Sequence, residues 1–417
     1  MDRMWRRGAV LAALIGGLTF GPVWAADANP LQQKALKLNE ITGTEPLEGQ
    51  LRLLIKDEAG TKKLVETAIK MLDDGRGPFN YTAAFLLARG AHSVKNYNAA
   101  QTFYKIASEQ AFKVQSAAKI IQVYDGLIDL FYENKKFDEA IKACREFLEI
   151  DNADRTSPIN RVKPFVMERM IQSLAKKGKV DEAIKLTDEL IEADGDGWYF
   201  VRLKAEVYRE AGKLEECAKT FEATLDRIKK LKDVEEDRRN RFARGIRYTL
   251  SGVYVDMKKI DMAAEQLQTL LKNDPDNPTF MNDLGFIWAD HDMNLDESEK
   301  LIRKAIEAER KQRKMIEDLS PEDDKDNPAY LDSLGWVLFK KKSYQDAKKH
   351  LLEASQAKEG QHIEILDHLA ETHLALGEKD DAIKVWQQSL KLENLSKREQ
   401  ERRVNVEKKL KKIQDSK

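Results

Sequence analysis

Small residues recur along this chain at intervals close to 34 positions, each within a similar pattern of apolar neighbours. The recurring small or compact residues are Ala100, Ala140, Ala183, Cys217, Ala263, Ser298, Ala347 and Ala382. Three of the seven intervals lie within one residue of 34, and the other four exceed 34 by 6, 9, 12 and 15 residues. Because insertions between units lengthen a period without destroying it, the pattern predicts an array of structural repeats.

Each period contains two apolar stripes with helical spacing. Another small or apolar residue lies about twelve positions before each recurring one, as Ala88 precedes Ala100, and a large apolar residue such as Tyr97 usually lies three positions before it. Residues three or four apart share a helix face, so each period predicts two amphipathic helices joined by a short turn. The composition agrees, because 34% charged residues with 21 Gly and 10 Pro among 417 favour helix over strand.

These columns resemble the tetratricopeptide repeat. The clearest matches are Leu334-Gly335-Trp336-Val337-Leu338 followed by Tyr344-Gln345-Asp346-Ala347, and Leu369-Ala370 followed by Ala382 and Trp386. The units from about Arg244 onward also resemble the C-terminal arrays of bacterial envelope tetratricopeptide proteins. The resemblance implies an all-α, right-handed α-solenoid of about eight helical hairpins, with N-terminal helices before it and a C-terminal capping helix after it.

The repeat register sets the expected domain boundaries. We expect a signal peptide over residues 1–25, an N-terminal helical region over 26–79, the solenoid over 80–395 and a capping helix over 396–417. The units are expected near 80–113, 121–154, 164–197, 198–231, 244–277, 278–310, 328–361 and 363–395. Of the insertions between units, residues 152–164 carry two prolines and are expected to form a loop, residues 229–241 can extend a helix, and residues 309–326 end in a turn-rich acidic linker.

The first 25 residues have the pattern of a cleaved secretory signal peptide. Three arginines precede the apolar run Gly8 to Phe20, and Val23-Trp24-Ala25 supplies the residues expected before a cut ahead of Ala26. The apolar run is too short to span a bilayer comfortably, so we expect a mature protein that is periplasmic or secreted. Two alternatives stay open, an uncleaved anchor and twin-arginine export through Arg6-Arg7.

Patterns that indicate catalysis or metal binding are scarce. The sequence has no Gly-rich phosphate loop followed by Lys, no nucleophile elbow and no His-Glu-x-x-His pair. His368 and His373 are five positions apart, so they cannot bind one metal from a single helix face. A net charge of −1 gives no general attraction to nucleic acid. We therefore expect no enzymatic activity, no cofactor and no metal.

Two further features have structural explanations. Cys144 and Cys217 are the only cysteines and fall in units that are not neighbours, so we expect two buried free thiols. The acidic segment 290–296 alternates like the start of a calcium loop, but Leu295 and Leu301 stand where that loop needs Gly and Glu. We expect this segment to be a hairpin turn expanded by one residue.

In stacked helical hairpins the first helices line a concave groove, which is the candidate binding site. In the N-terminal half, the register places Phe165 and Glu168 among the groove residues. In the C-terminal half, which we favour as the site, it places Tyr248, Asn282, Phe286, Asp332, Trp336, Phe339, Asp367 and Glu371. Aromatic side chains beside carboxylates suit a partner segment with an apolar anchor and adjacent Lys or Arg.

The expected function is a non-enzymatic scaffold of the cell envelope that binds peptide or helical segments of other proteins in this groove. The partner is expected to be protein and not nucleic acid, with no stable membrane insertion after signal cleavage. The alternative is a subunit that binds polysaccharide or cell wall through the same aromatic residues. The basic helix expected over 396–417 is either a solubilising cap or an arm for acidic partners, and the sequence leaves both open.

Overall fold

The computed structural model describes residues 28–77, 79–150, 156–195, 197–317, 319–320, 324–393 and 395–415. Within these ranges the chain forms twenty α-helices, two short 3-10 helices and no β-strand, which confirms the all-α prediction. None of the helices described there is both long enough and apolar enough to cross a membrane. The expected signal peptide, residues 1–25, lies outside the described residues.

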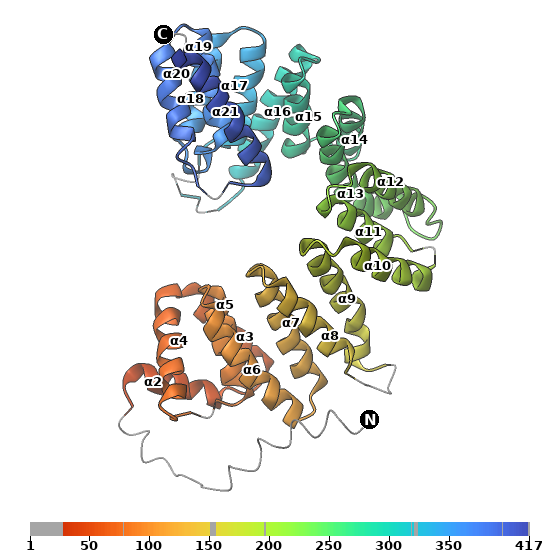
Figure 1. The fold of residues 1–417 in the computed structure, drawn as a ribbon, viewed down its shortest axis with the longest axis vertical. Coiled ribbons are helices and arrows are strands. Elements are labelled where there is room, and N and C mark those ends of the chain that lie inside the picture. Colours follow the sequence, from red (N-terminus) through yellow and green to blue (C-terminus); the bar gives the residue numbers. More distant parts are fainter. Residues whose placement is uncertain are drawn as a thin grey trace. The chain divides into compact units, whose positions relative to one another are not determined.

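The helices cluster into two compact units, residues 1–186 and residues 187–417 (Figure 1). The first unit contains α2 (Pro30–Lys37), η3 (Leu38–Glu40), α3 (Thr44–Lys56), α4 (Glu58–Asp73), α5 (Tyr81–Ser93), α6 (Tyr97–Lys113), α7 (Ala117–Glu133), α8 (Phe137–Leu148) and α9 (Pro158–Lys176). Helices α3 and α4 pack against α5, and α2 packs against α4. Leu54 and Leu64 of these N-terminal helices are buried, and the Leu54 side chain lies beside Gly90 of α5.

The second unit holds the remaining hairpins and the C-terminal helix. It contains α11 (Tyr199–Glu210), α12 (Leu214–Lys229), α13 (Glu236–Asp256), α14 (Ile260–Asn273), α15 (Pro278–Asp290), α16 (Leu295–Arg313), α17 (Pro328–Lys340), α18 (Tyr344–Gln356), η4 (Lys358–Gly360), α19 (Ile363–Ala375), α20 (Lys379–Ser389) and α21 (Lys397–Asp415). Helix α10 (Val180–Asp194) crosses the boundary between the units. Successive helices pack as the hairpins α11–α12, α13–α14, α15–α16, α17–α18 and α19–α20.

The small residues that recur along the sequence are buried, as the repeat register requires. All eight recurring small residues, from Ala100 to Ala382, have 0% exposed surface. The glycines of the first helices show why small residues are needed there. A Cβ at Gly335 would lie 2.5 Å from Leu351 Cγ, and a Cβ at Gly285 would lie 2.6 Å from Ile302 Cγ1. The two helices of each of these hairpins therefore approach most closely at these columns.

The turn inside most hairpins ends the first helix with one residue in the left-handed conformation. That residue is a glycine in three turns and a lysine in four: Gly178, Gly212, Gly377, Lys95, Lys135, Lys258 and Lys342. The next N–H donates to a carbonyl five residues earlier, as Lys179 N–H does to Leu174 O at 2.9 Å. The α15–α16 turn is one residue longer and has two left-handed residues, Asp292 and Asn294. This confirms the expanded turn predicted for the acidic segment.

The first insertion differs from the expected loop over residues 152–164. Helix α9 already begins at Pro158 and continues through Pro164. Ser157 caps it by accepting a hydrogen bond from Ile159 N–H at 3.3 Å, and a proline at the first helical position needs no N–H partner. The expectation was wrong because Pro164 was taken as a helix end, whereas an interior proline can remain when the surrounding packing holds the helix. The second insertion, residues 229–241, does not form one continuous helix. Helix α12 ends at Lys229, and α13 begins at Glu236.

Arginines of α16 hold the acidic linker of the third insertion. Arg310 donates hydrogen bonds to both carboxylate oxygens of Asp326, and Arg313 pairs with Asp324 and Asp326. The hydrogen bond from Arg310 lowers the pKa of Asp326, although burial opposes this effect. Asn327 then caps α17 by accepting from Ala329 N–H at 2.9 Å. Arg313 and Asp326 also line a pocket of about 920 Å³. The ion pairs therefore hold Asp324 and Asp326, at the end of the linker, against α16.

The C-terminal helix α21 packs against α19 and α20. Val406 and Leu410 are buried in one apolar cluster with Trp386. At its start, Ser396 N–H donates to Glu399 Oε2 at 2.8 Å, and Ser396 Oγ accepts from Glu399 N–H at 3.4 Å. This reciprocal pair is the capping box that the sequence indicated. Helix α21 therefore covers the last hairpin, as expected of a capping helix.

Candidate functional site

The first-helix faces that were predicted to line the C-terminal groove carry a stack of aromatic rings. Trp336 stacks on His368 with ring centroids 3.9 Å apart and planes 12° apart, and it stacks on Phe339 at 4.8 Å. The Phe286 ring centroid lies 6.3 Å from that of His368. Trp336 is 7% exposed, and its indole N–H donates to Asp290 Oδ1 at 3.0 Å. These predicted groove aromatics therefore pack on one another across α15, α17 and α19.

Asp332 and His368 form a buried pair between α17 and α19. Asp332 Oδ1 lies 2.9 Å from His368 Nδ1. Burial alone would lower the pKa of His368, but the neighbouring Asp332 carboxylate outweighs burial and raises it. Asp332 was expected to be an acid at the rim of the groove. In the structure, the Asp332 carboxylate is instead buried and contacts His368.

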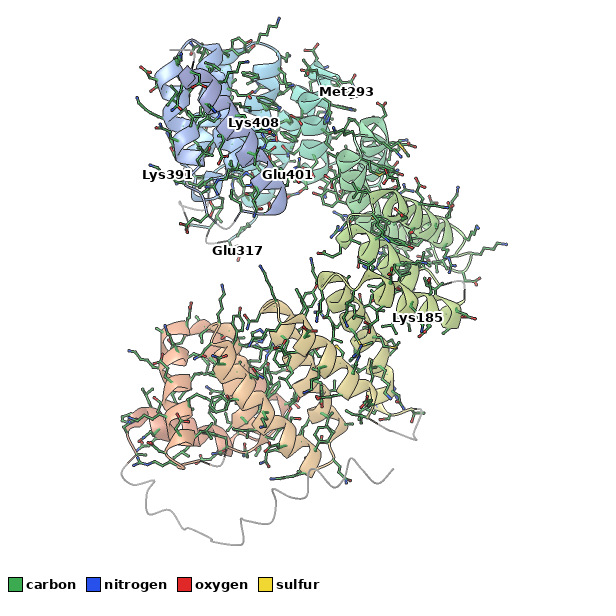
Figure 2. The ribbon with its side chains drawn as sticks, in the orientation of Figure 1. Lys185, Met293, Glu317, Lys391, Glu401 and Lys408 are labelled. Carbon is green, nitrogen blue, oxygen red and sulfur yellow. The ribbon has the colours of Figure 1, made fainter. Side chains whose placement is uncertain are left out.

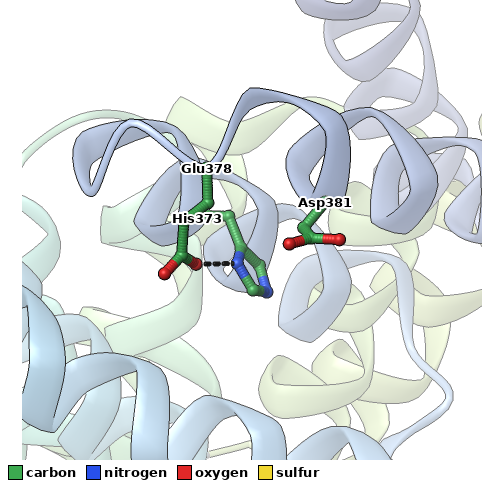
Figure 3. Close-up of side chains that lie close together, drawn as sticks. All are labelled: His373, Glu378 and Asp381. Atoms are coloured by element: carbon green, nitrogen blue, oxygen red, sulfur yellow. Dashed lines mark hydrogen bonds and ion pairs between the residues drawn. The ribbon is translucent and has the colours of Figure 1, made fainter.

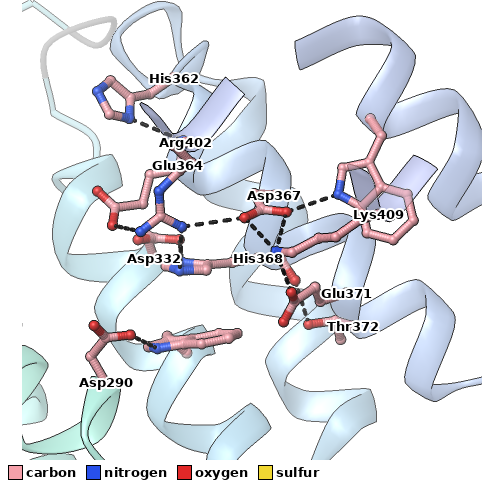
Figure 4. A network of polar contacts seen from close by, with 12 residues as sticks. Asp290, Asp332, His362, Glu364, Asp367, His368, Glu371, Thr372, Arg402 and Lys409 are labelled. Atoms are coloured by element: carbon pink, nitrogen blue, oxygen red, sulfur yellow. Dashed lines mark hydrogen bonds and ion pairs between the residues drawn. The ribbon is translucent and has the colours of Figure 1, made fainter. Parts of the chain in front are cut away.

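Asp367 is also buried and accepts hydrogen bonds from two elements. The indole N–H of Trp386 on α20 donates to Oδ1 at 2.9 Å. From α21, the Lys409 ammonium lies 2.9 and 2.8 Å from the two carboxylate oxygens, and Arg402 Nη1 lies 3.3 Å from Oδ2. Figure 4 shows both basic side chains reaching Asp367. This carboxylate is therefore fully satisfied within the protein.

Two further carboxylates of α19 belong to the same network. Lys409 pairs with Glu371, and Arg402 pairs with Glu364. Burial alone would lower the pKa of Lys409, but the carboxylates of Asp367 and Glu371 raise it, so this lysine keeps its charge. The sequence indicated an open acidic rim at α19. The structure differs because α21 lies over that rim and neutralises it.

The part of the predicted groove that α21 does not cover includes Tyr248 on α13 and Asn282 on α15. Tyr248 is 40% exposed, and its hydroxyl donates to Asp283 Oδ2 at 2.7 Å. Asn282 is 5% exposed and donates through its amide nitrogen to Asp283 Oδ1 at 3.3 Å. No residue in the described part of the chain donates to the buried Asn282 Oδ1. Burial raises the pKa of Asp283, against the effect of the two hydrogen bonds.

A second groove lies in the first unit, between α7, α8 and α9. It has a volume of about 640 Å³ and an apolar floor that includes Ile128 and Val166. Phe165 is 63% exposed at this groove. Asp129 lies 2.9 Å from Arg169, and burial raises its pKa. The sequence register found Phe165 but gave no sign of the cavity, because its size depends on how α8 and α9 are spaced.

Three side chains at the α19–α20 turn bring metal-ligating atoms within 4.8 Å of one another: His373, Glu378 and Asp381 (Figure 3). His373 Nδ1 lies 2.6 Å from Glu378 Oε2. The Lys348 ammonium lies 2.7 Å from both Glu378 oxygens, and the Lys384 ammonium lies 3.0 Å from Asp381 Oδ1. Both carboxylates already have cationic partners, so the cluster is explained as an ion-pair network.

Comparison with known proteins identifies the repeats. A family model described as tetratricopeptide repeat matches residues 169–229 and 248–313, and a model described as regulator of microtubule dynamics protein 1-3 matches residues 337–414. The "TPR repeat-containing protein PA4667" of Pseudomonas aeruginosa is 27% identical over 207 residues, which span 50% of this chain and 30% of that protein.

Solved structures of helical repeat proteins are also similar. A tetratricopeptide repeat protein from Parabacteroides merdae has a TM-score of 0.45 and 14% identity, and the match covers 68% of this chain and 98% of that one. MamA from Desulfovibrio magneticus has a TM-score of 0.36 and 15% identity over 47% of this chain and 96% of its own. Together with the family model and the buried repeat register, the relative from Pseudomonas leads to one conclusion. The chain contains tetratricopeptide repeats.

Proposed function

We propose that this protein is a non-enzymatic interaction scaffold of the cell envelope that binds a segment of another protein along α13 and α15. The residues that bind are Tyr248, Asn282 and Phe286, with Asp283 beside them. Tetratricopeptide repeats generally bind protein partners, and the aromatic and polar groups on these two helices are suited to that work.

The unpaired carbonyl oxygen of Asn282 supports this proposal most directly. A buried acceptor without a donor destabilises a protein by about 1–3 kcal/mol, so its presence needs an explanation. Rotation of the Asn282 side chain toward solvent would let a backbone N–H of a partner segment supply the missing donor. The exposed Tyr248 ring offers an apolar contact next to it, and the Asp283 carboxylate would accept from a Lys or Arg of the same segment.

The envelope location rests on the N-terminal sequence, in which three arginines precede the apolar run Gly8 to Phe20. Cell fractionation with N-terminal sequencing tests it, and we expect the mature chain to begin at or near Ala26. A chain that keeps Met1 and stays in the cytoplasmic fraction would contradict the envelope location. That outcome would not bear on the binding proposal, which the crosslinking experiment tests separately.

A photo-crosslinking side chain at Gly252 tests the binding face. Gly252 lies one helical turn after Tyr248 on α13, and a Cβ there meets no atom within 4 Å, so a probe side chain can start from this position without a clash. The matched control carries the probe at Met262 on α14, which is 38% exposed. In envelope extract, we expect the Gly252 probe to capture a protein that the Met262 probe does not capture.

A second variant connects the captured protein to Asn282. Asn282→Leu removes the amide and leaves the partner donor unsatisfied, which should weaken binding about tenfold or more. Its melting temperature, measured in parallel, separates loss of binding from loss of folding. Equal capture at both probe positions, or capture of carbohydrate alone, would contradict the proposal and in the second case favour the glycan-binding alternative.

A further inference from the structure

The C-terminal helix α21 presents one basic and apolar face to α19. Arg402, Val406 and Lys409 lie at positions i, i+4 and i+7 and therefore share that face. Val406 has 0% exposed surface, whereas Arg398 on the same helix is exposed. Lys408 is exposed as well (Figure 2). Arg402, Val406 and Lys409 thus form a docked stripe on α21, and residues such as Arg398 and Lys408 face solvent.

The acidic side chains of α19 match this stripe in spacing. Glu364, Asp367 and Glu371 lie at i, i+3 and i+7, and each pairs with Arg402 or Lys409. The matching side chains are carboxylates on α19 and cations on α21, on either side of a buried valine. An apolar anchor with flanking Arg and Lys is also the chemistry that the sequence indicated for a partner of this groove.

We propose that α21 is an internal ligand of the α19 face, and that a partner helix with the same Arg–apolar–Lys spacing binds there by displacing it. The inference rests on the proposed function, because it names the partner chemistry and the regulation of the same groove. With α21 in place the α19 face is closed to partners. With α21 released, the groove extends from α13 and α15 onto α19.

When a partner helix takes the place of α21, no buried charge on α19 loses all of its contacts. Asp367 keeps its hydrogen bond from Trp386, which belongs to α20 and not to α21. A partner helix with the same spacing replaces the Arg402 and Lys409 contacts with equivalent ones. The displaced α21 exposes two buried apolar side chains, Val406 and Leu410, and is otherwise mostly hydrophilic, so it can stand free in water.

Competition from α21 sets the affinity that a partner needs. A helix tethered by a short segment acts as a ligand at an effective concentration of about 1 mM, so a partner at micromolar concentration needs an advantage of about a thousandfold. A partner gains such an advantage by contacting Tyr248 and Asn282 at the same time as α19. Segments that reach only the α19 face therefore cannot compete with α21 at micromolar concentration. Competition from α21 thus makes binding selective for longer segments.

The experiment uses the full chain and a fluorescent peptide of residues 396–417 as the probe. Arg402→Ala with Lys409→Ala weakens the docked stripe, and the matched control Arg398→Ala with Lys408→Ala removes two exposed charges from the same helix. We expect the first variant to bind the peptide about tenfold more tightly than the unmodified chain, and the control variant to bind it like the unmodified chain. Hydrogen exchange should be faster in the α21 amides of the first variant.

Three results would overturn the proposal. One is equal peptide affinity in all three chains although α21 exchanges faster in the first variant. Another is unchanged exchange in that variant, which would show that the ion pairs do not hold α21. The third is a dimer in which two copies exchange α21. The peptide assay needs no natural partner, so its failure can be told apart from failure of the crosslinking experiment at Gly252.

Discussion

The Trp336 indole lies parallel to the His368 imidazole at a centroid distance of 3.9 Å, while its N–H donates to Asp290. One side chain of α17 is therefore held by α19 on its face and by α15 at its edge. Stacked rings contribute about 0.5–1.5 kcal/mol beyond the area that they bury. Trp336 thus joins three successive hairpins, whereas the repeat register placed it among the residues of the candidate binding groove.

Trp336→Ala should accordingly lower stability. Truncating a buried Trp costs about 3–5 kcal/mol, and the substitution also leaves Asp290 without its indole donor. Trp336→Phe keeps an aromatic ring on His368 and removes the N–H, so its loss should be smaller. Urea unfolding monitored by circular dichroism measures both variants. An alanine variant as stable as the unmodified chain would show that the stack does not join the hairpins.

His368 should make stability depend on pH in a defined direction. Its pKa is raised above the ordinary value of 6.5, so the folded state holds the proton more tightly than the unfolded chain. The stabilisation from this pair is therefore complete below pH 6.5 and is lost as the pH rises through the raised pKa. We expect the difference in unfolding free energy between the unmodified chain and His368→Gln to be larger below that range than above it.

The matched control for this pH experiment is His291→Gln, since His291 is exposed and its ring contacts the Ile287 carbonyl of its own helix. This control measures the effect of removing an exposed imidazole from the same chain. If the His368→Gln difference grows as the pH rises, the pair is stabilised by the neutral imidazole and the assignment of a raised pKa is wrong.

Two glycines in first helices should respond to alanine with opposite signs. Gly335→Ala places a Cβ 2.5 Å from Leu351 Cγ, and such overpacking typically costs about 1–3 kcal/mol. Gly252→Ala meets no atom within 4 Å in α13, so the gain in helix propensity should stabilise by about 0.5–1 kcal/mol. The melting temperatures of both variants, compared with that of the unmodified chain, measure these changes in stability. A Gly335→Ala variant that melts no lower would mean that the α17–α18 hairpin can separate without penalty.

Both thiols should react slowly in the folded protein. Cys144 and Cys217 are buried and free, and burial raises the pKa of each thiol from 9.0 to about 12. The thiolate is the reactive form, so a disulfide reagent at neutral pH should modify these residues only as the chain unfolds. The same reaction in denaturant supplies the reference rate. Rapid modification without denaturant, or an intramolecular disulfide seen by mass spectrometry, would contradict the burial of these residues.

The sequence predicted the elements of the fold well because the signals that define them are local. Small residues such as Gly285 mark where two helices cross, and the extra residue in the α15–α16 turn is visible as a change in spacing. The candidate site was predicted less well. Spacing placed Asp367 among the groove residues, but it could not show that α21 lies over this carboxylate. Which helix covers another depends on contacts between segments that are distant along the chain, and a repeat pattern carries no information about them.

Four of the hairpin turns hold a lysine in the left-handed conformation that others fill with glycine: Lys95, Lys135, Lys258 and Lys342. A side chain in that conformation costs roughly 1–2 kcal/mol. These lysines lie in turns, outside the α13 and α15 positions that we propose for binding. Exchanging them for glycine, one turn at a time, should raise the melting temperature of the array and leave the proposed binding positions unchanged. The turns are therefore the places where heat resistance can be adjusted, by selection or by design, without altering those positions.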